Sequence, residues 1–462
     1  MSHSKIFLLI ACACLIFQVA LTEYNIAEIG ADTLIITADS PSYTNPAKSF
    51  IEKGEWKDNF DGPSSYVQRA PFYGILYLFS STVSSHPLTV LKIIQYLFMF
   101  GGIFFFGKLI HLLTRNRTIS FIAATCFGLL PFFHGFVGYV MTEAIAPYLF
   151  ILFIFSFVRL YNDQKGRLLF IVVGAVILIF RVQLIIFPLL FVLALLFQHK
   201  QKAIFTLLMF VPLIFWQLRV NYVMGSFQLH PIYSYSNRTI FRPPHQELTN
   251  FLRVWEHDSE QFHKAEAVLR KDTTQLSLSQ ASNFLTYESR KRAKNILVLY
   301  QQVAMKQNQM WGKGENRKLV IEEVFVAEAQ KFEKLHRNDF SKYNYWLFTP
   351  TNSLIDLVKS SHLNHYVFQK TLRGNIFIEL LRFMAVVITI TSLITSMLLL
   401  FSKKTSLPVK VTIFAFILSL FYLVFVQRLN ETRYMTPYLP VLFTSLWLFY
   451  NNFTKRAKQL IA

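Results

Sequence analysis

Long apolar runs and short polar segments alternate along most of the chain. A helix that crosses a lipid bilayer needs about 20 consecutive, mainly apolar residues. The pattern therefore predicts an all-α polytopic membrane protein with about ten transmembrane helices. We place these helices near residues 5–22, 88–113, 118–138, 141–160, 168–180, 185–198, 203–222, 375–401, 409–427 and 434–452.

Three apolar segments need a choice between interpretations. The segment 168–198 contains Arg181 and Pro188 near its centre, and we predict two short helices rather than one long tilted helix. A charged side chain is costly at mid-bilayer, whereas at a helix junction it can reach water or a phosphate, and proline suits the start of a helix. The segment 72–84 is too short to span and is predicted to lie at the membrane interface. The first apolar run is either a helix or a cleaved signal peptide, but no clear small-x-small site precedes Glu23.

Basic residues in the short polar segments predict the orientation. Cytoplasmic loops carry an excess of Lys and Arg, and with the N-terminus in the cytoplasm the inner segments contain many basic residues and a single acid, Asp163. Two long segments, 23–87 and 223–373, then lie outside. The inner basic residues are Lys5, Arg115, Arg117, Arg159, Lys165, Arg167, Lys200, Lys202, Lys403, Lys404, Lys410, Lys455, Arg456 and Lys458.

The composition of the long segments predicts the domain organisation. Apolar residues at helical spacing with charged faces, as in 247–255 and 318–325, indicate a mostly helical soluble subdomain outside the membrane. The predicted parts are an N-terminal membrane module at 1–222 with its first external loop at 23–87, the external helical subdomain at 223–373, and C-terminal membrane helices at 374–462.

Composition and charge exclude several classes of protein. Hydrophobic residues are 53% of the chain and charged residues only 16%, so most of the chain cannot form the surface of a soluble protein. The net charge of +20 would suggest a nucleic-acid partner for a soluble domain, but here the cations orient helices, and we predict no such partner. Cys12, Cys14 and Cys126 lie in apolar runs without ligand spacing, which indicates neither a disulfide framework nor a metal site.

Under this topology, polar residues from distant segments meet on the outer face. A carboxylate at a membrane boundary has to be paired or functional, which makes Asp39 and Glu143 the candidate acids. A guanidinium group binds phosphate oxygens in a fork, which makes Arg69, Arg181 and Arg433 candidate phosphate ligands. The outer clusters are Asp39 with Tyr43, Arg69 with Tyr73, Thr142 with Glu143, and Arg433 with Tyr434.

The order of these short motifs resembles a known family. The pattern is similar to the polyprenyl-phosphate-sugar-dependent glycosyltransferases of the GT-C fold, which include protein O-mannosyltransferases, the aminoarabinose transferases of lipid A and many bacterial envelope transferases. In residues 1–222 the motifs occur in the same order as in this family, and residues 375–452 resemble it in their predicted helical architecture. The resemblance does not cover the external subdomain. The motifs are Asp39-Ser40-Pro41-Ser42-Tyr43, Gly54-Glu55-Trp56, Arg69-Ala70-Pro71-Phe72-Tyr73, Thr142-Glu143 and Arg433-Tyr434.

The resemblance implies a function and roles for the residues. It implies an inverting transfer of a sugar from a polyprenyl-phosphate donor to a glycan, lipid or protein acceptor, at the external or periplasmic face of a bacterial inner membrane. Asp39 would be the general base. The substrate and donor would be bound by Arg69, Tyr73, Tyr43, Glu143, Arg181, Arg433 and Tyr434.

The chain also departs from this family. Several relatives carry an acidic dipeptide where this chain has Asp39-Ser40, and the aminoarabinose transferases have a glutamate where this chain has Gln68. Fewer carboxylates argue against a tightly bound divalent cation, which the sequence leaves open as a cofactor. The same departures argue against the aminoarabinose donor and acceptor.

Each candidate residue also has a structural interpretation. Asp39 has the residue type and position of a helix cap, Glu143 those of an N-terminal helix residue favoured by the helix dipole, and Arg433 those of an interfacial anchor. His134 is predicted to be a hydrogen-bonded buried histidine rather than a ligand.

Two other function classes fit part of the pattern. A secondary transporter would contain many helices and a charge near the midplane, but the related halves and broken helices of that class are not found. An envelope polysaccharide polymerase or ligase would also combine a large external segment with arginines, and would use a lipid diphosphate glycan as its donor. The polymerase or ligase differs from the glycosyltransferase in its donor, a lipid diphosphate glycan instead of a lipid monophosphate sugar. Loss of function on replacing Asp39 would favour the glycosyltransferase.

Overall fold

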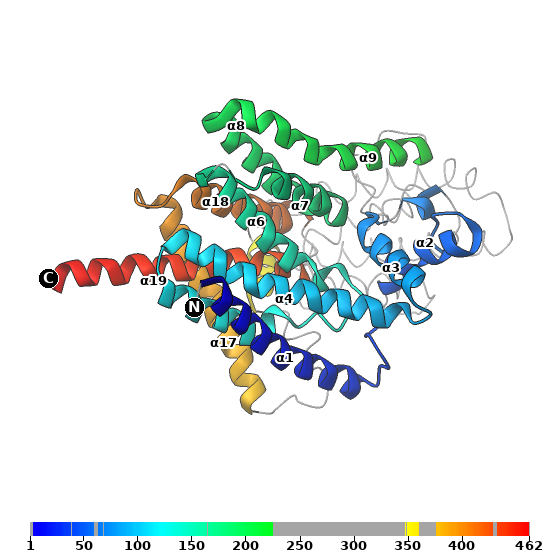
Figure 1. Cartoon of the computed structure of the whole chain (residues 1–462), viewed down its shortest axis with the longest axis horizontal. Coiled ribbons are helices and arrows are strands. Elements are labelled where there is room, and N and C mark those ends of the chain that lie inside the picture. The colour runs from blue at the N-terminus through cyan, green and yellow to red at the C-terminus, as the bar shows by residue number, and fades with distance from the viewer. Residues whose placement is uncertain are drawn as a thin grey trace, which may run out of the picture. The chain divides into compact units, whose positions relative to one another are not determined.

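The computed structural model describes residues 3–37, 39–59, 63–67, 69–163, 165–224, 347, 349–359, 376–427 and 432–461. These residues are almost entirely helical (Figure 1), so the predicted all-α class is confirmed. Most of the predicted external subdomain at 223–373 lies outside the described residues. The chain divides into a first compact unit, Met1–Ile232 with Ser360–Ser419 and Thr432–Ala462, and a second unit, Tyr233–Lys359 with Leu420–Glu431.

The first unit contains the helices that matter for the site. The α-helices are α1 His3–Ile29, α2 Ser40–Lys53, α3 Phe72–Val83, α4 Pro87–Thr114, α5 Arg117–Leu129, α6 Ala146–Asp163, α7 Arg167–Phe180, α8 Ile186–Thr206, α9 Val211–Met224, α17 Ile376–Phe401, α18 Leu407–Phe421 and α19 Leu439–Ile461. Short 3-10 helices are η1 Pro63–Tyr66, η2 Pro131–Phe133, η3 Thr142–Ala144, η4 Val182–Ile185, η5 Leu207–Phe210 and η11 Thr432–Tyr438. In the second unit, α16 Thr349–Lys359 contacts the π-helical η10 Tyr422–Gln427.

Several of these helices have the length and apolar composition of membrane-spanning helices. Among the described residues, five helical segments are long and apolar enough to cross one: His3–Ile29, Pro87–Thr114, Ala203–Val223, Glu379–Phe401 and Leu407–Phe425. Four shorter apolar helices are Phe72–Val83, Arg117–Leu129, Arg167–Phe180 and Ile186–Gln198. The protein is therefore a helical membrane protein, with fewer full-length spanning helices in the described part than the ten predicted.

One predicted crossing, 118–138, is wrong as a single helix. Asn116 caps α5 by accepting a hydrogen bond from the Ile119 backbone N–H at 3.2 Å, and α5 ends at Leu129. Pro131 has no backbone N–H to continue the helix, and it favours the extended conformation that Leu130 adopts. The chain then turns through η2 towards η3, which places Glu143 outside any regular helix.

The predicted break in 168–198 is confirmed. Helix α7 ends at Phe180, Arg181 has an extended backbone, and α8 begins at Ile186 after the short η4. Pro188 falls in the first turn of α8, where its missing N–H leaves no hydrogen bond unmade. The alternative of one long tilted helix is wrong.

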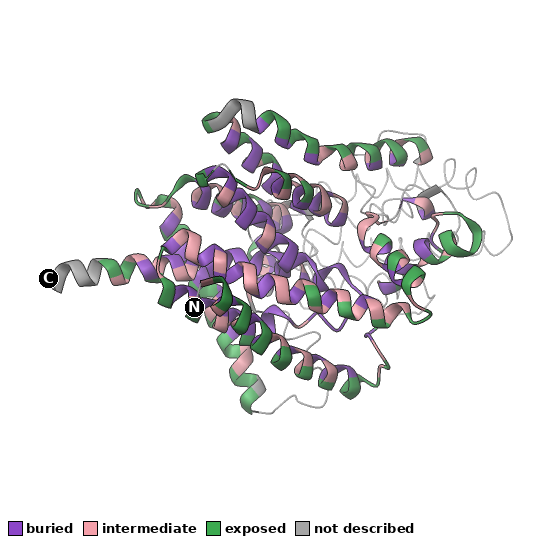
Figure 2. Cartoon of the chain, in the orientation of Figure 1, coloured by how far each residue is buried: buried purple, intermediate pink, exposed green. Residues whose placement is uncertain are grey.

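Helix α6 lies at the centre of the first unit. Most of its residues are buried, on all sides of the helix (Figure 2), as expected for a helix that is apolar all round. Phenylalanine rings pack on it from two neighbouring helices: Phe153 stacks on Phe170 at 5.0 Å, and Phe157 stacks on Phe191 at 3.8 Å. The many phenylalanines therefore fill the core as well as face the lipid.

Helices α4 and α6 approach closely because Gly102 has no side chain. A Cβ added at Gly102 would overlap Tyr148 Cδ1 and lie 2.9 Å from Tyr148 Cβ and Cγ, whereas a Cβ at the neighbouring Gly101 would meet nothing within 4 Å. We expect Gly102→Ala to lower the free energy of unfolding by about 1–3 kcal/mol through overpacking. The matched control, Gly101→Ala, should be neutral or stabilising by up to about 1 kcal/mol. Unfolding of the purified protein in detergent checks this, and equal effects of the two changes would contradict it.

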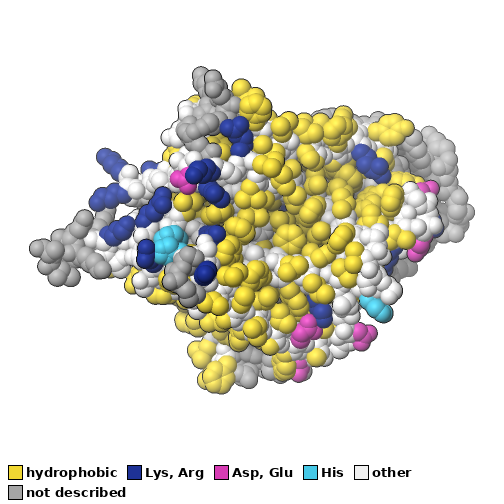
Figure 3. Space-filling view, in the orientation of Figure 1, with side chains coloured by type: hydrophobic (Ala, Val, Ile, Leu, Met, Phe, Trp, Pro, Cys, Tyr) yellow, Lys and Arg dark blue, Asp and Glu magenta, His cyan; other side chains and the backbone are white. Residues whose placement is uncertain are grey.

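Charge is distributed unevenly over the first unit. On the face shown in Figure 3, Lys and Arg side chains gather at the end where Figure 1 marks the N-terminus, and a broad hydrophobic band follows. Arg115, Lys165, Lys403 and Lys404 are exposed residues of the polar segments between helices. A basic end beside an apolar band is the pattern expected at the cytoplasmic side of a membrane protein.

Candidate functional site

A short backbone pairing brings the first polar motif to the third. The Ile35 N–H donates to the Gly138 carbonyl at 2.8 Å, and the Val140 N–H donates to the Ile35 carbonyl at 3.1 Å. The hydroxyl of Ser40 also donates to the Val140 carbonyl, at 2.9 Å. The segment that leads to Asp39 is therefore held against the segment that leads to Glu143.

Asp39 is paired with two arginines from distant parts of the chain. Arg69 Nη2 lies 3.3 Å from Asp39 Oδ1, and Arg433 Nη2 donates to Asp39 Oδ2 from a position 394 residues away. Asp39 occupies the N-cap position of α2, but its side chain makes no capping hydrogen bond. Its carboxylate serves the two arginines instead of the helix.

Glu143 forms the buried part of the same cluster. Arg181 Nη1 lies 3.1 Å from Glu143 Oε1, and Arg433 Nε lies 3.9 Å from the same oxygen. The Thr142 hydroxyl donates to Glu143 Oε2 at 3.0 Å. The Glu143 side chain is only 2% exposed and that of Arg181 9%, compared with 27% for Asp39 and 26% for Arg69. The cluster thus runs from an accessible edge at Asp39 to a buried floor at Glu143.

These ion pairs join all five charges in one chain of contacts. The order is Arg69, Asp39, Arg433, Glu143 and Arg181, with Arg433 bridging the two carboxylates. Three guanidinium groups against two carboxylates leave an excess of positive charge. In a site of low polarity such an excess favours the binding of an anion.

Aromatic rings line the accessible edge. The Arg69 guanidinium lies 4.9 Å from the centre of the Tyr43 ring, which in turn lies 5.5 Å from the Tyr73 ring. Burial opposes the charged form of Arg69, but Tyr43 and Asp39 outweigh burial and raise the pKa of Arg69, so it stays cationic. Tyr434 lies 5.9 Å from the Arg433 guanidinium and 6.0 Å from that of Arg181, within the range of cation–π attraction.

The structure also reveals supporting residues that sequence reasoning missed. Gln95, fully buried in α4, donates to the Tyr73 hydroxyl at 2.9 Å and to the Tyr139 carbonyl at 3.0 Å. Ser42 accepts from Arg69 Nε at 3.0 Å and donates to the Asp39 carbonyl at 2.7 Å. A glutamine within an apolar run is the signal that would have indicated the first of these.

The structure thus brings all eight predicted site residues into one cluster. His134 lies outside it: Nδ1 contacts the Tyr148 hydroxyl and Nε2 the Phe127 carbonyl, both at 2.8 Å, so it is the hydrogen-bonded buried histidine predicted. Within the part of the chain that the structure describes, no three His, Cys, Asp or Glu side chains gather as metal ligands. Each site carboxylate is instead held by arginines.

The charge of Glu143 predicts how stability depends on pH. Burial would raise the pKa of this carboxyl, but Arg181 and Arg433 outweigh burial and hold its pKa below the ordinary value of 4.5. A depressed native pKa contributes stability that is fully present above that ordinary value and is lost as pH falls below it. Thermal unfolding in detergent should therefore show a loss of stability below pH 4.5 that is smaller in Glu143→Gln. Equal acid sensitivity of both proteins would contradict this role.

Comparison of the sequence with models of protein families and with curated proteins finds no match. Function is therefore inferred from the motifs and the geometry of the site.

Proposed function

We propose that this protein is an inverting glycosyltransferase that moves a sugar from a polyprenyl-phosphate donor to a glycan, lipid or protein acceptor. The observation that carries the proposal is the cluster itself. Asp39 stands at the accessible edge of a cluster in which five separate segments bring together three arginines and two carboxylates beside apolar helices. A general base beside a site for a lipid-linked phosphate is the arrangement this reaction needs.

The proposed step is a single displacement. The acceptor hydroxyl oxygen forms a bond to the anomeric carbon while the bond from that carbon to the phosphate oxygen breaks. The hydroxyl proton passes to the Asp39 carboxylate, and polyprenyl phosphate leaves with the electron pair. Attack from the side opposite the phosphate inverts the anomeric centre.

The arginines would stabilise the leaving phosphate as its charge grows. Both Asp39 oxygens are engaged by guanidinium groups, and a carboxylate held in this way is a poor proton acceptor. A donor phosphate that competes for Arg69 or Arg433 would free one carboxylate oxygen. Donor binding would therefore prepare the base for the acceptor.

Helix α3 supports a lipid-linked donor. It buries Tyr73, Tyr77 and Ser80, and it exposes Ile75, Phe79 and Val83. The exposed residues follow one another at helical spacing, so they form one apolar stripe next to the site. A short helix with such a stripe suits the membrane interface and the first part of a polyprenyl chain.

The proposal includes a finer topology. We place about ten crossings in the membrane, with α5, α6, α7, the first part of α8 and α19 added to the five long apolar segments, as in the GT-C fold. The basic end shown in Figure 3 would be cytoplasmic, and the cluster around Asp39 would face the periplasm of a bacterial inner membrane.

The test compares envelope glycans and glycolipids by mass spectrometry in a deletion strain that carries wild type, Asp39→Asn or Asp32→Asn. Asp32 is an exposed acid of the same external loop and is the matched control. A sugar should be missing in the deletion strain, restored by wild type and Asp32→Asn, and still missing with well-expressed Asp39→Asn. Restoration by Asp39→Asn would overturn the assignment of the base.

A second arm tests the donor. Purified protein in liposomes is given either a polyprenyl monophosphate sugar or a polyprenyl diphosphate glycan. Turnover of the monophosphate supports the proposal. Turnover of the diphosphate alone would make the protein a polysaccharide polymerase or ligase and overturn it.

A further inference from the structure

Two basic residues lie at the same level on neighbouring helices, far from the cluster around Asp39. Lys108 belongs to α4 and Arg159 to α6. The two helices run in the same direction, because residue numbers increase along both helices from one contact to the next. Gly102 meets Tyr148, and further along both helices the Phe105 ring lies 5.3 Å from the Phe155 ring.

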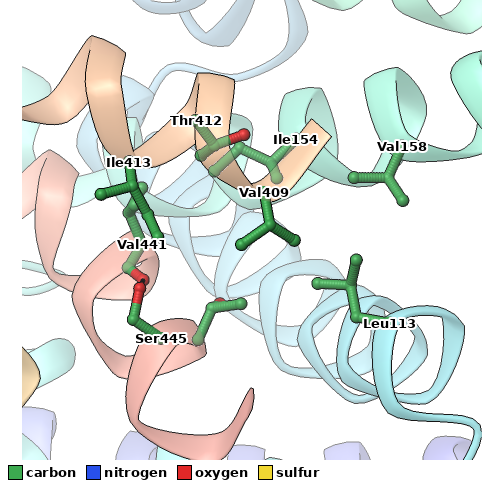
Figure 4. A pocket seen from close by; sticks show the side chains of 9 residues that line it. Leu113, Ile154, Val158, Val409, Thr412, Ile413, Val441 and Ser445 are labelled. Atoms are coloured by element: carbon green, nitrogen blue, oxygen red, sulfur yellow. Dashed lines mark hydrogen bonds between the residues drawn. The ribbon is translucent and has the colours of Figure 1, made fainter. Parts of the chain in front are cut away.

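The ring contact places the two basic residues at nearly the same level, because Lys108 follows Phe105 by three residues and Arg159 follows Phe155 by four. Leu113 and Val158 line one small cavity of about 20 Å³ between α4, α6, α18 and α19 (Figure 4). The cavity lies beyond Lys108 along α4, since Leu113 follows Lys108 by five residues, and it lies beside Arg159, which directly follows Val158 along α6. The charge of Arg159 acts on Lys108, which agrees with this placement.

The cavity itself is not the site. Its hydroxyl groups already bond to carbonyls of their own helices, Thr412 to Pro408 at 2.8 Å and Thr444 to Pro440 at 2.7 Å. The Ser445 hydroxyl likewise donates to the Val441 carbonyl at 3.2 Å, the other lining residues are aliphatic, and the volume is about enough for a single water molecule. The two cations are the feature that calls for a ligand.

Among the described residues, neither Lys108 nor Arg159 has an ion pair or a hydrogen bond. The Lys108 ammonium lies 4.4 Å from the centre of the Phe104 ring, and both basic side chains are only half-buried. Lys108 precedes the end of α4 by six residues, which is about 9 Å of helix. Lys108 lies within the predicted crossing 88–113, where a charged group is normally paired, and two adjacent cations repel each other unless an anion lies between them.

We propose that Lys108 and Arg159 form a binding site for the phosphate of an anionic phospholipid headgroup on the basic side of the membrane. Basic positions between transmembrane helices are a known way to bind such headgroups. The half-buried cations would bind the phosphate, and the exposed apolar surface of the neighbouring helices would contact the acyl chains. This site is independent of the proposed glycosyl transfer.

The test measures lipid retention by native mass spectrometry. The full-length protein is extracted from membranes that contain equal amounts of phosphatidylglycerol and phosphatidylcholine. The double variant Lys108→Gln with Arg159→Gln removes the site, and Lys403→Gln with Lys404→Gln removes the same charge from the exposed loop between α17 and α18. Wild type and the loop variant should retain phosphatidylglycerol preferentially. The site variant should lose that preference about tenfold or more, since two basic residues are removed.

Two further arms make the result decisive. Lys108→Glu supplies an internal partner for Arg159, so it should keep its fold and still lose the bound phosphatidylglycerol. Inorganic phosphate is added to wild type to distinguish a lipid from a free anion, and it should not displace the lipid. Equal loss in the site and loop variants, retention by Lys108→Glu, or displacement by inorganic phosphate would each overturn the proposal.

Discussion

Asp39→Asn is expected to lower the rate of sugar transfer by about 10²–10⁴-fold, the usual contribution of a positioned general base. An asparagine keeps the size of the side chain but cannot accept the hydroxyl proton. The side chain lies at the accessible edge of the cluster, 27% exposed, where an acceptor can reach it. The measurement is the rate of transfer by purified protein in liposomes that contain the polyprenyl monophosphate donor.

Two comparisons separate a lost base from a lost fold. Asp39→Asn also removes the charge that faces Arg69 and Arg433, so its unfolding in detergent is measured beside its activity. Asp39→Glu keeps the carboxylate and should retain more activity than Asp39→Asn, while Asp32→Asn should be as active as wild type. If Asp39→Asn is folded and transfers sugar at more than about a tenth of the wild-type rate, Asp39 is not the base.

Glu143→Gln is expected to have the largest effect on stability, a loss of about 3–5 kcal/mol in the free energy of unfolding. The side chain of Glu143 is almost fully buried and balances Arg181 and Arg433. Without it, the buried Arg181 guanidinium would face a neutral amide, and Arg433 would keep only Asp39 as its carboxylate partner. Unfolding of the purified protein in mixed detergent micelles gives the value.

The control is another Glu–Arg pair on a helix surface. Arg382 Nη1 lies 2.7 Å from Glu379 Oε1, but the Glu379 side chain is 50% exposed. Glu379→Gln should cost less than Glu143→Gln, because the Glu379 side chain is half-exposed and Arg382 is 14% exposed, whereas Glu143 is 2% exposed. Combining Glu143→Gln with Arg181→Met removes one of the unbalanced charges and should recover part of the loss. If the double variant is no more stable than Glu143→Gln, the effect does not come from unpaired charge.

The buried pair has a consequence for the proposed chemistry. Arg433 contacts both carboxylates, so Glu143 holds it in place when Asp39 releases it. A site that stabilises a leaving phosphate works best when its charges are fixed before the reaction. The fixed position of Arg433 would therefore come from its contact with the buried Glu143.

Local signals in the sequence were enough to predict much of the fold. Apolar runs predicted most of the helices, because hydrophobicity and helix length are properties of a single segment. Arg181 and Pro188 predicted the break between α7 and α8 for the same reason. The single crossing predicted at 118–138 is wrong because α5 ends before Pro131, although apolar residues continue on both sides of that proline.

The candidate site was also predictable only in part from the sequence. The sequence by itself identified the charged and aromatic residues of the cluster, because charged residues next to apolar segments are costly and few in number. Only the tertiary structure decided how they pair: Asp39 with Arg433, 394 residues away, and Glu143 between Arg433 and Arg181. An ion pair depends on distances of a few ångströms between segments, and those distances come from the packing of α4, α6 and α19 and the backbone pairing at Ile35. No pattern within one segment records them.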